Sequence, residues 1–320
     1  MKGGENSGDP PLGGAAPAEV YLFAPELDLV ADRATGSYPG LERILGRGRA
    51  RACPAGPWAT LRQLLGADPE ATAVAPVSFA GEVGMPEQGC LRLAPVGGRP
   101  EQGEVETVTA AGLGLSLEEA RSLAAAFDEV LGNGSLTMHV PDPRRWYLHG
   151  VPGWRGGGAP GTPPEHPPEP ELLRLLSEIE MLFFQHPVNQ ARAEAGQSLV
   201  TGVKAWGGGH PAGVALREAP ALAGGEPWLS GLARLAGGSH SPGVEGLERG
   251  GVAWPVPVEA ADTDLPGRLE EAWCEPLLQA LGRGRLKAVS LVTRRRSFTV
   301  SRLACRIPWR RPRTLRESLC

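Results

Sequence analysis

The stretch FFQHPVNQARAEAGQSLVTGVKAWGGGH, residues 183–210, decides the fold predicted for this chain. Pro187 ends one helix, because proline lacks a backbone N–H and clashes with the preceding turn. A second helix is expected to begin with Asn189 as its N-cap and to stop at Gly196. Residues 198–206 then read as a strand that closes on three glycines. Two helices followed by a strand in so short a span are typical of α/β proteins.

Strand-like and helix-like segments alternate on both sides of this stretch. The clearest is 116–134, where Ser116 and Glu119 form an S-x-x-E capping box ahead of an apolar helical stripe. A turn is expected at 97–100, and a helix break at Pro276. Further strands are expected at 20–23, 72–79, 91–96, 104–110, 135–140, 144–149, 285–293 and 297–303, and further helices at 41–48, 58–66, 171–184, 227–238 and 265–285.

Composition divides the chain. Residues 1–18 contain no apolar signal sequence and are expected to form a disordered tail. Glycine and proline dominate residues 150–170, which predicts a linker or lid between an N-terminal α/β portion, 19–149, and a C-terminal α/β portion, 171–320. No segment is long and apolar enough to span a membrane, and the five scattered cysteines form no C-x-x-C pair. These features favour a cytoplasmic protein.

Charge is distributed unevenly. The net charge is −4, yet residues 283–320 hold twelve Lys/Arg and one acid, Glu317. This segment must therefore face either the acidic remainder of the chain or an anionic partner.

Four segments together resemble a known family. They are SEIEMLFFQHPVNQARAEAG at 177–196, WGGG at 206–209, PLLQALGRGRL at 276–286 and WRRPR at 309–313. Their order resembles that of bacterial RpfE-type regulatory proteins, which are in turn similar to archaeal-type cofactor-independent phosphoglycerate mutases of the alkaline phosphatase superfamily. The resemblance implies an alkaline-phosphatase-like mixed sheet flanked by helices, with an N-terminal α/β portion.

The sequence departs from the mutase pattern where those enzymes bind metals. The mutases hold two divalent metals through aspartates and histidines, including an Asp after the first strand and a late Asp-His pair. Here the first strand ends in Phe-Ala-Pro-Glu, the late strand ends in Val-Thr-Arg-Arg-Arg, and no Asp-His pair exists. Two-metal phosphoryl transfer needs several carboxylates and imidazoles around ions about 4 Å apart. We therefore expect a regulatory protein without catalytic residues, metal ligands or a cofactor.

Two groups of residues are candidates for binding a small anionic or phosphorylated ligand. His186, Asn189 and Arg192 could face an anion at a strand edge, because guanidinium suits phosphate. The structural alternative is that they cap helices and satisfy the local backbone. In the second group, successive backbone N–H groups after a strand could form an anion nest, and a plain glycine turn is the alternative. This group comprises Trp206, Gly207, Gly208, Gly209 and His210.

Two other functions stay open. An active metal-dependent phosphomutase or phosphatase with a rearranged site would require scattered residues such as Asp28, Asp32, His210 and His240 to converge. A nucleic-acid-binding protein would use the basic segment 283–320, although its apolar residues at strand spacing favour a folded hairpin with a charged outer face.

Overall fold

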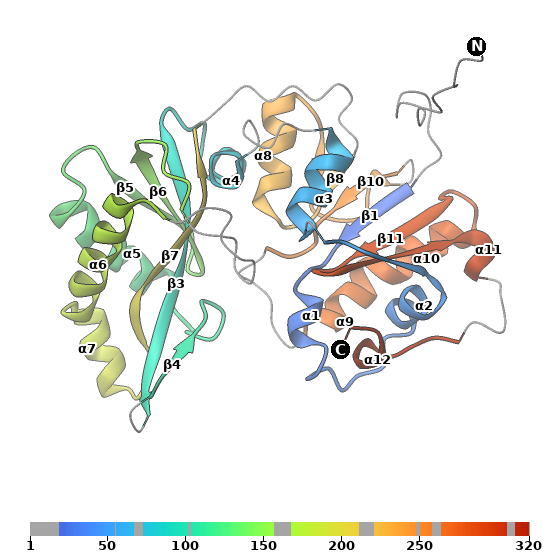
Figure 1. Cartoon of the computed structure of the whole chain (residues 1–320), viewed down its shortest axis with the longest axis horizontal. Helices are drawn as coiled ribbons and strands as arrows, with labels where there is room; N and C mark the ends of the chain where they lie inside the picture. Colours follow the sequence, from blue (N-terminus) through green and yellow to red (C-terminus); the bar gives the residue numbers. More distant parts are fainter. Residues whose placement is uncertain are drawn as a thin grey trace, which may run out of the picture.

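The computed structural model describes residues 19–54, 56–66, 73–101, 104–156, 168–210, 221–247, 250–257, 264–305 and 311–319. Two sheets organise them, one of seven strands and one of five, and the sheets form separate lobes (Figure 1). The predicted fold class, a mixed α/β sheet flanked by helices, is confirmed. The predicted tail, 1–18, and residues 157–167 of the predicted linker lie outside the described residues.

The larger sheet has the strand order β2-β12-β11-β1-β10-β8-β9. Five strands are parallel: β1 (Glu19–Phe23), β8 (Leu222–Ala223), β9 (His240–Ser241), β10 (Gly251–Ala253) and β11 (Ala288–Val292). Two antiparallel strands, β12 (Arg296–Ser301) and β2 (Arg49–Ala52), complete one edge. The strands expected at 20–23, 285–293 and 297–303 are thus confirmed.

Helices cover both faces of this sheet, which explains the continuous apolar run of β1. Val20 and Leu22 pack on the side of α2 (Pro39–Arg47), α9 (Leu265–Leu269) and α10 (Glu275–Gly282). Phe23 points to the other side, toward α3 (Gly56–Leu65) and α8 (Pro227–Ala236). The helix does not break at Pro276, which lies in the first turn of α10; the irregularity is a π-helical segment, Glu270–Cys274, between α9 and α10.

The smaller sheet is built around the long strand β3 (Gly89–Glu101). Antiparallel neighbours of β3 are β4 (Glu104–Val108), β6 (Arg145–Val151) and β7 (Leu199–Gly209), and β5 (Thr137–Asp142) pairs with β6. The prediction of a turn at 97–100 is wrong. Those residues continue β3 and pair with β4, because ladder hydrogen bonds override the local glycine and proline signal.

Strand pairing crosses the predicted portions of the chain. β7 follows the segment 150–170 but pairs with β3, which precedes that segment. Conversely, β1 near the start pairs with β10 and β11 near the end. The smaller sheet carries α5 (Leu117–Val130) and α6 (Pro170–Phe184) on one face, and α7 (Pro187–Glu194) follows α6. None of the described helices could cross a membrane.

The strand expected at 72–79 is wrong, because these residues belong to helix α4 (Val74–Glu82). Every residue from Val74 to Ala80 is buried, since α4 lies between the smaller sheet and α8 (Figure 1). A helix buried on all sides has no polar stripe, so its apolar run resembles a buried strand. Glycine allows the close contact: a Cβ on Gly231 would lie 1.7 Å from the Val77 carbonyl oxygen.

Candidate functional site: a pocket at the carboxyl edge of the larger sheet

The two helices at 183–196 are confirmed, but their cap is not Asn189. His186 is the N-cap of α7, and its Nδ1 accepts a hydrogen bond from the Val188 N–H at 3.2 Å. Pro187 occupies the first helical position, which places the cap one residue before it. Partial burial lowers the pKa of His186 below its ordinary value, which favours the neutral imidazole that this bond requires.

Asn189 is buried, and its side chain forms hydrogen bonds with the backbone of β7. Its Nδ2 donates to the carbonyl oxygens of Phe183 and Val200, and its Oδ1 accepts from the Val200 N–H, each at 2.8 Å. The amide thus satisfies both backbone groups of Val200, as a neighbouring strand would. All of these partners are structural.

Arg192 is also engaged within the fold, with 2% of its surface exposed. Its Nε donates to the Ser198 carbonyl at 2.8 Å, and its Nη1 contacts Glu119 at 2.9 Å. Partial burial alone would raise the pKa of Glu119, but hydrogen bonds from Ser116 and Arg192 hold that pKa below its ordinary value. Arg192 therefore joins α7 to the capping box of α5.

The three glycines after Trp206 do not form a turn beyond a strand. They belong to β7, and the register shifts between the pairs Arg92–Trp206 and Cys90–Gly209. Gly207 has φ of +65°, and the Gly208 N–H donates to the Arg155 carbonyl at 2.9 Å. The glycines are thus a bulge in a paired strand.

The two predicted groups of ligand residues lie at opposite ends of β7. Val200, which Asn189 contacts, and Trp206 are six positions apart in one strand, or about 20 Å. Trp206 is buried, and its ring faces the guanidinium of Arg92 at 4.9 Å. His210, just past the strand, is exposed. The fold does not combine the eight residues into one site.

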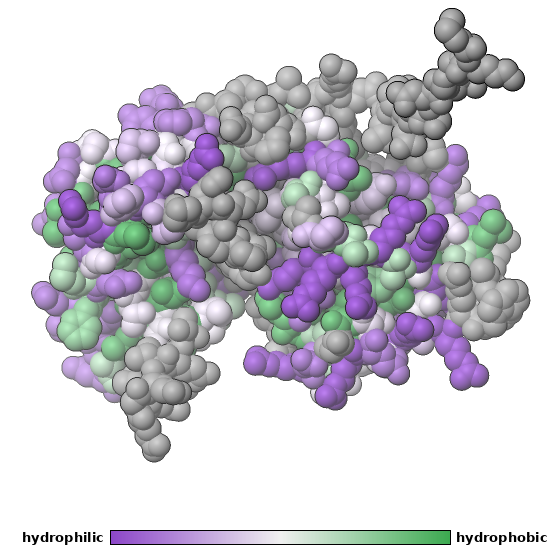
Figure 2. All heavy atoms as spheres, in the orientation of Figure 1, coloured by the Kyte–Doolittle hydropathy of each residue, from purple (hydrophilic) through white to green (hydrophobic). Residues whose placement is uncertain are grey.

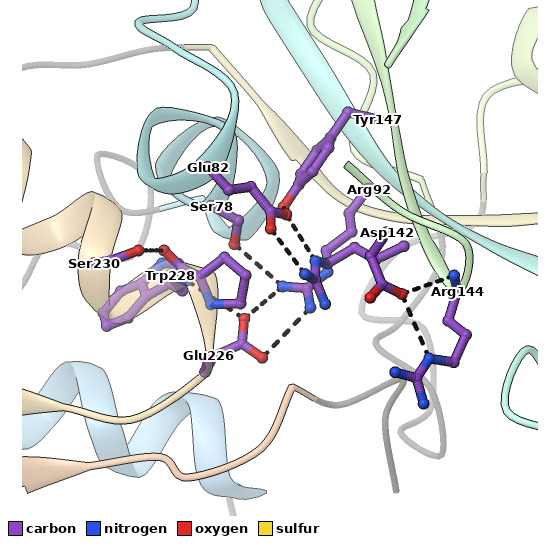
Figure 3. Close-up of polar contacts among 11 residues, drawn as sticks. Ser78, Glu82, Arg92, Asp142, Arg144, Tyr147, Glu226, Trp228 and Ser230 are labelled. Atoms are coloured by element: carbon purple, nitrogen blue, oxygen red, sulfur yellow. Dashed lines mark hydrogen bonds and ion pairs between the residues drawn. The ribbon is translucent and has the colours of Figure 1, made fainter. Parts of the chain in front are cut away.

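A buried network of charged residues connects the sheets and was not predicted from the sequence (Figure 3). Arg92 of β3 pairs with Glu226, the N-cap of α8, at 2.5 Å, and both side chains are fully buried. On α4, Ser78 accepts from Arg92 at 3.2 Å, and Glu82 binds Arg145 through two hydrogen bonds of 2.7 and 2.8 Å. Only the tertiary fold brings these residues together.

Beside this network, a pocket of 320 Å³ lies where β10 ends. In open α/β sheets, ligands bind beyond the carboxyl ends of the parallel strands. Arg144 reaches the pocket from the turn between β5 and β6, where Asp142 binds its backbone N–H at 2.9 Å and its Nε at 3.4 Å. Arg268 of α9 is the second cationic residue that lines the pocket. Residues of both lobes form the lining: Arg144, Pro255, Val256, Pro257, Arg268, Leu269, Ala272 and Trp273.

The residues that a rearranged metal site would require make other contacts in the described structure. Asp28 accepts a 2.7 Å hydrogen bond from the Arg294 N–H, and desolvation raises the pKa of its carboxyl, although hydrogen bonds from Arg294 and Thr293 oppose the shift. Asp32 lies 3.9 Å from Arg316, and His240 Nε2 is 3.0 Å from the Gly224 carbonyl. Within the described ranges, no group of three or more His, Cys, Asp or Glu could hold a metal ion.

The fold and pocket define an α/β protein of two sheets with a cationic site at the carboxyl edge of the larger one. No family model and no curated protein matches the sequence. Among solved structures, the cofactor-independent phosphoglycerate mutase from Thermoplasma acidophilum DSM 1728 is similar at a TM-score of 0.38 and 20% identity, over 89% of this chain and 90% of that one. The PH0037 protein from Pyrococcus horikoshii is similar at a TM-score of 0.47 and 12% identity, over 89% and 87%.

Proposed function

We propose that this chain is a phosphoglycerate-mutase-like regulatory protein that binds a small anionic or phosphorylated ligand between its two sheets. The observation that carries the proposal is the pocket at the end of β10, which Arg144 and Arg268 line from different lobes. Guanidinium groups bind phosphate and carboxylate with favourable geometry. The resemblance to RpfE-type proteins supports the regulatory role, and the cytoplasmic location stays a prediction from the cysteine pattern.

The proposal excludes two-metal phosphoryl transfer. Its support is the chemistry of the residues after β1 and β11: Asp28 is bound by a backbone N–H, and Arg294 and Arg295 bring positive charge where the mutase pattern would place metal ligands. Positive charge opposes the binding of divalent cations.

Calorimetric titration of the full chain with inorganic phosphate and with 3-phosphoglycerate tests ligand binding, with glycerol as the uncharged probe. Arg144→Gln is expected to weaken phosphate binding about tenfold or more, because a charge-assisted hydrogen bond contributes about 1.5–3 kcal/mol. Arg174→Gln, an exposed position on α6, is the matched control. Failure of both anions to bind, or equal affinities of the two variants, would overturn the proposal.

The expected absence of metal-dependent phosphoryl transfer is tested separately, with manganese and a generic phosphate ester. No turnover above the buffer rate is expected. Metal-dependent turnover that disappears in Asp28→Asn would show that the chain kept a catalytic site.

A further inference from the structure

An arginine-rich surface covers the β2–β12 edge of the larger sheet. It consists of residues 39–52, 294–305 and 311–319, which include α11 (Arg302–Cys305) and α12 (Leu315–Leu319). Glu42 and Glu317 are the only acids within these three segments, and Asp28 and Asp32 of the chain before them contact Arg294 and Arg316. Its cations are Arg43, Arg47, Arg49, Arg51, Arg294, Arg295, Arg296, Arg302, Arg311, Arg313 and Arg316. Figure 2 shows hydrophilic side chains gathered over this part of the larger lobe.

Tertiary contacts make this arginine surface continuous. The backbone of α2 touches the C-terminal segment, since the Arg313 N–H donates to the Glu42 carbonyl at 3.2 Å. On its other side, Arg47 donates to the carbonyl of Cys305 in α11. β2 pairs with β12 in the register Arg51–Ser297 and Arg49–Thr299. The surface therefore joins arginines from the start and the end of the chain.

Arg316 lies 3.9 Å from Asp32, but ion pairing within the chain does not account for the two arginines of β2. Neither Arg49 nor Arg51 has a side-chain hydrogen bond or ion pair with any described residue, and every residue of β2 is exposed. Glu317 is occupied by the Thr314 N–H at 3.0 Å. Charged residues on an edge strand also prevent that strand from pairing with other chains. One or two charges of either sign are enough for this purpose, so it does not explain eleven arginines. The excess of a single sign favours an anionic partner.

We propose that the arginine surface binds the phosphate backbone of a nucleic acid duplex without reading its sequence. A duplex presents a dense row of phosphates, which arginine binds in bidentate geometry. Single strands are usually held by stacking on aromatic side chains, and no aromatic residue is exposed in the described part of this surface. Leu303 is its one exposed large apolar side chain, whereas membrane binding needs a buried apolar face. The proposal is independent of the pocket.

Fluorescence anisotropy with a duplex of about 20 base pairs, as DNA and as RNA, tests the proposal across about 50 to 200 mM salt. The full chain is expected to bind either duplex, with an affinity that falls steeply with salt. Replacing both Arg49→Gln and Arg51→Gln should reduce the slope of log affinity against log salt by about 2. A second pair, Arg43→Gln with Arg302→Gln, should act likewise and guards against a folding defect in the first.

The matched control is Arg121→Gln with Arg174→Gln, two exposed arginines on α5 and α6 of the other lobe. It makes the same change in net charge and should leave the slope unchanged, and circular dichroism checks that all variants are folded. Absence of duplex binding at about 50 mM salt, or equal loss in the control, would overturn the proposal. Binding to phosphatidylserine vesicles but not to duplexes would assign the surface to a membrane instead.

Discussion

Asn189 lies in helix α7 but stabilises the contact between two other elements. Its amide joins the end of α6 to the first residues of β7 through three hydrogen bonds. A side chain with one donor group and one acceptor can satisfy the N–H and C=O of an edge residue together, and few residue types can do so. Asn189, which the sequence suggested as a ligand contact, instead holds the edge strand β7 against the end of α6.

Asn189→Ala is therefore expected to destabilise the protein by about 1–3 kcal/mol, because buried backbone groups lose their partners. Asn189→Asp should destabilise it further, since a carboxylate cannot donate to the carbonyls of Phe183 and Val200. Urea unfolding measures both. Gln190→Ala, an exposed neighbour, should change stability little, and an equal loss at both positions would contradict this role for Asn189.

At the scale of elements, the bulge in β7 lets three segments meet. A Cβ on Gly208 would lie 2.1 Å from the Trp154 carbonyl oxygen, and one on Gly209 would lie 2.6 Å from the Cβ of Ala73. Glycine here is needed for close approach of other backbone segments.

Gly208→Ala should accordingly cost about 1–3 kcal/mol, the usual range for inserting atoms into a well-packed region, and thermal unfolding will show the loss as a lower melting temperature. Gly84→Ala is the control, because its Cβ would meet nothing within 4 Å. Two equally stable variants would argue that the bulge is not tightly packed.

The packing of α4 on the smaller sheet should depend on pH. Phe79 stacks on His149 with ring centroids 5.4 Å apart, and His139 is 6.1 Å from His149. Desolvation, followed by the charge of His149, lowers the pKa of His139 below 6.5, while Asp128 opposes the shift. The unfolded chain thus binds the proton more readily, so stability is complete above pH 6.5 and is lost as the pH falls through the lowered value.

Urea unfolding at about pH 7.5 and about pH 5.5, on either side of the ordinary histidine pKa, should show this loss. His139→Gln should reduce it, because the substituted side chain does not titrate. An unchanged pH dependence in the variant would mean that other groups, such as His186 and His240, whose pKa values burial also lowers, account for the loss.

At the scale of the whole molecule, the Arg92–Glu226 pair couples the two sheets. Arg92 belongs to the central strand of the smaller sheet, and Glu226 follows β8 of the larger one. Removing one partner leaves a buried charge uncompensated, which typically costs about 3–5 kcal/mol. Replacing both by apolar residues is often far less costly.

Arg92→Met and Glu226→Met should each destabilise the protein strongly, and the double variant should be much more stable than the sum of the single losses predicts. A double-mutant cycle in urea measures this coupling. Additive losses would contradict a direct energetic link between the sheets.

The sequence predicted those elements whose signals are local. The capping box of Ser116 and Glu119 correctly marks α5, and the apolar run of β1 marks a strand buried on both faces. Prediction from the sequence failed where contacts between distant segments decide the secondary structure. α4 has no polar stripe because both its sides are covered, and Gly97–Pro100 stays in a strand because β4 pairs with it.

By itself, the sequence determined an alternating α/β chain and an uneven distribution of charge. The tertiary structure alone decided where the two proposed binding surfaces lie. It directed Asn189 and Arg192 into the fold, placed Arg144 and Arg268 around one pocket, and set Arg49 and Arg51 beside the C-terminal arginines. The physical reason is that helix and strand signals act within a few residues, whereas a site depends on which distant segments the burial of apolar faces brings together.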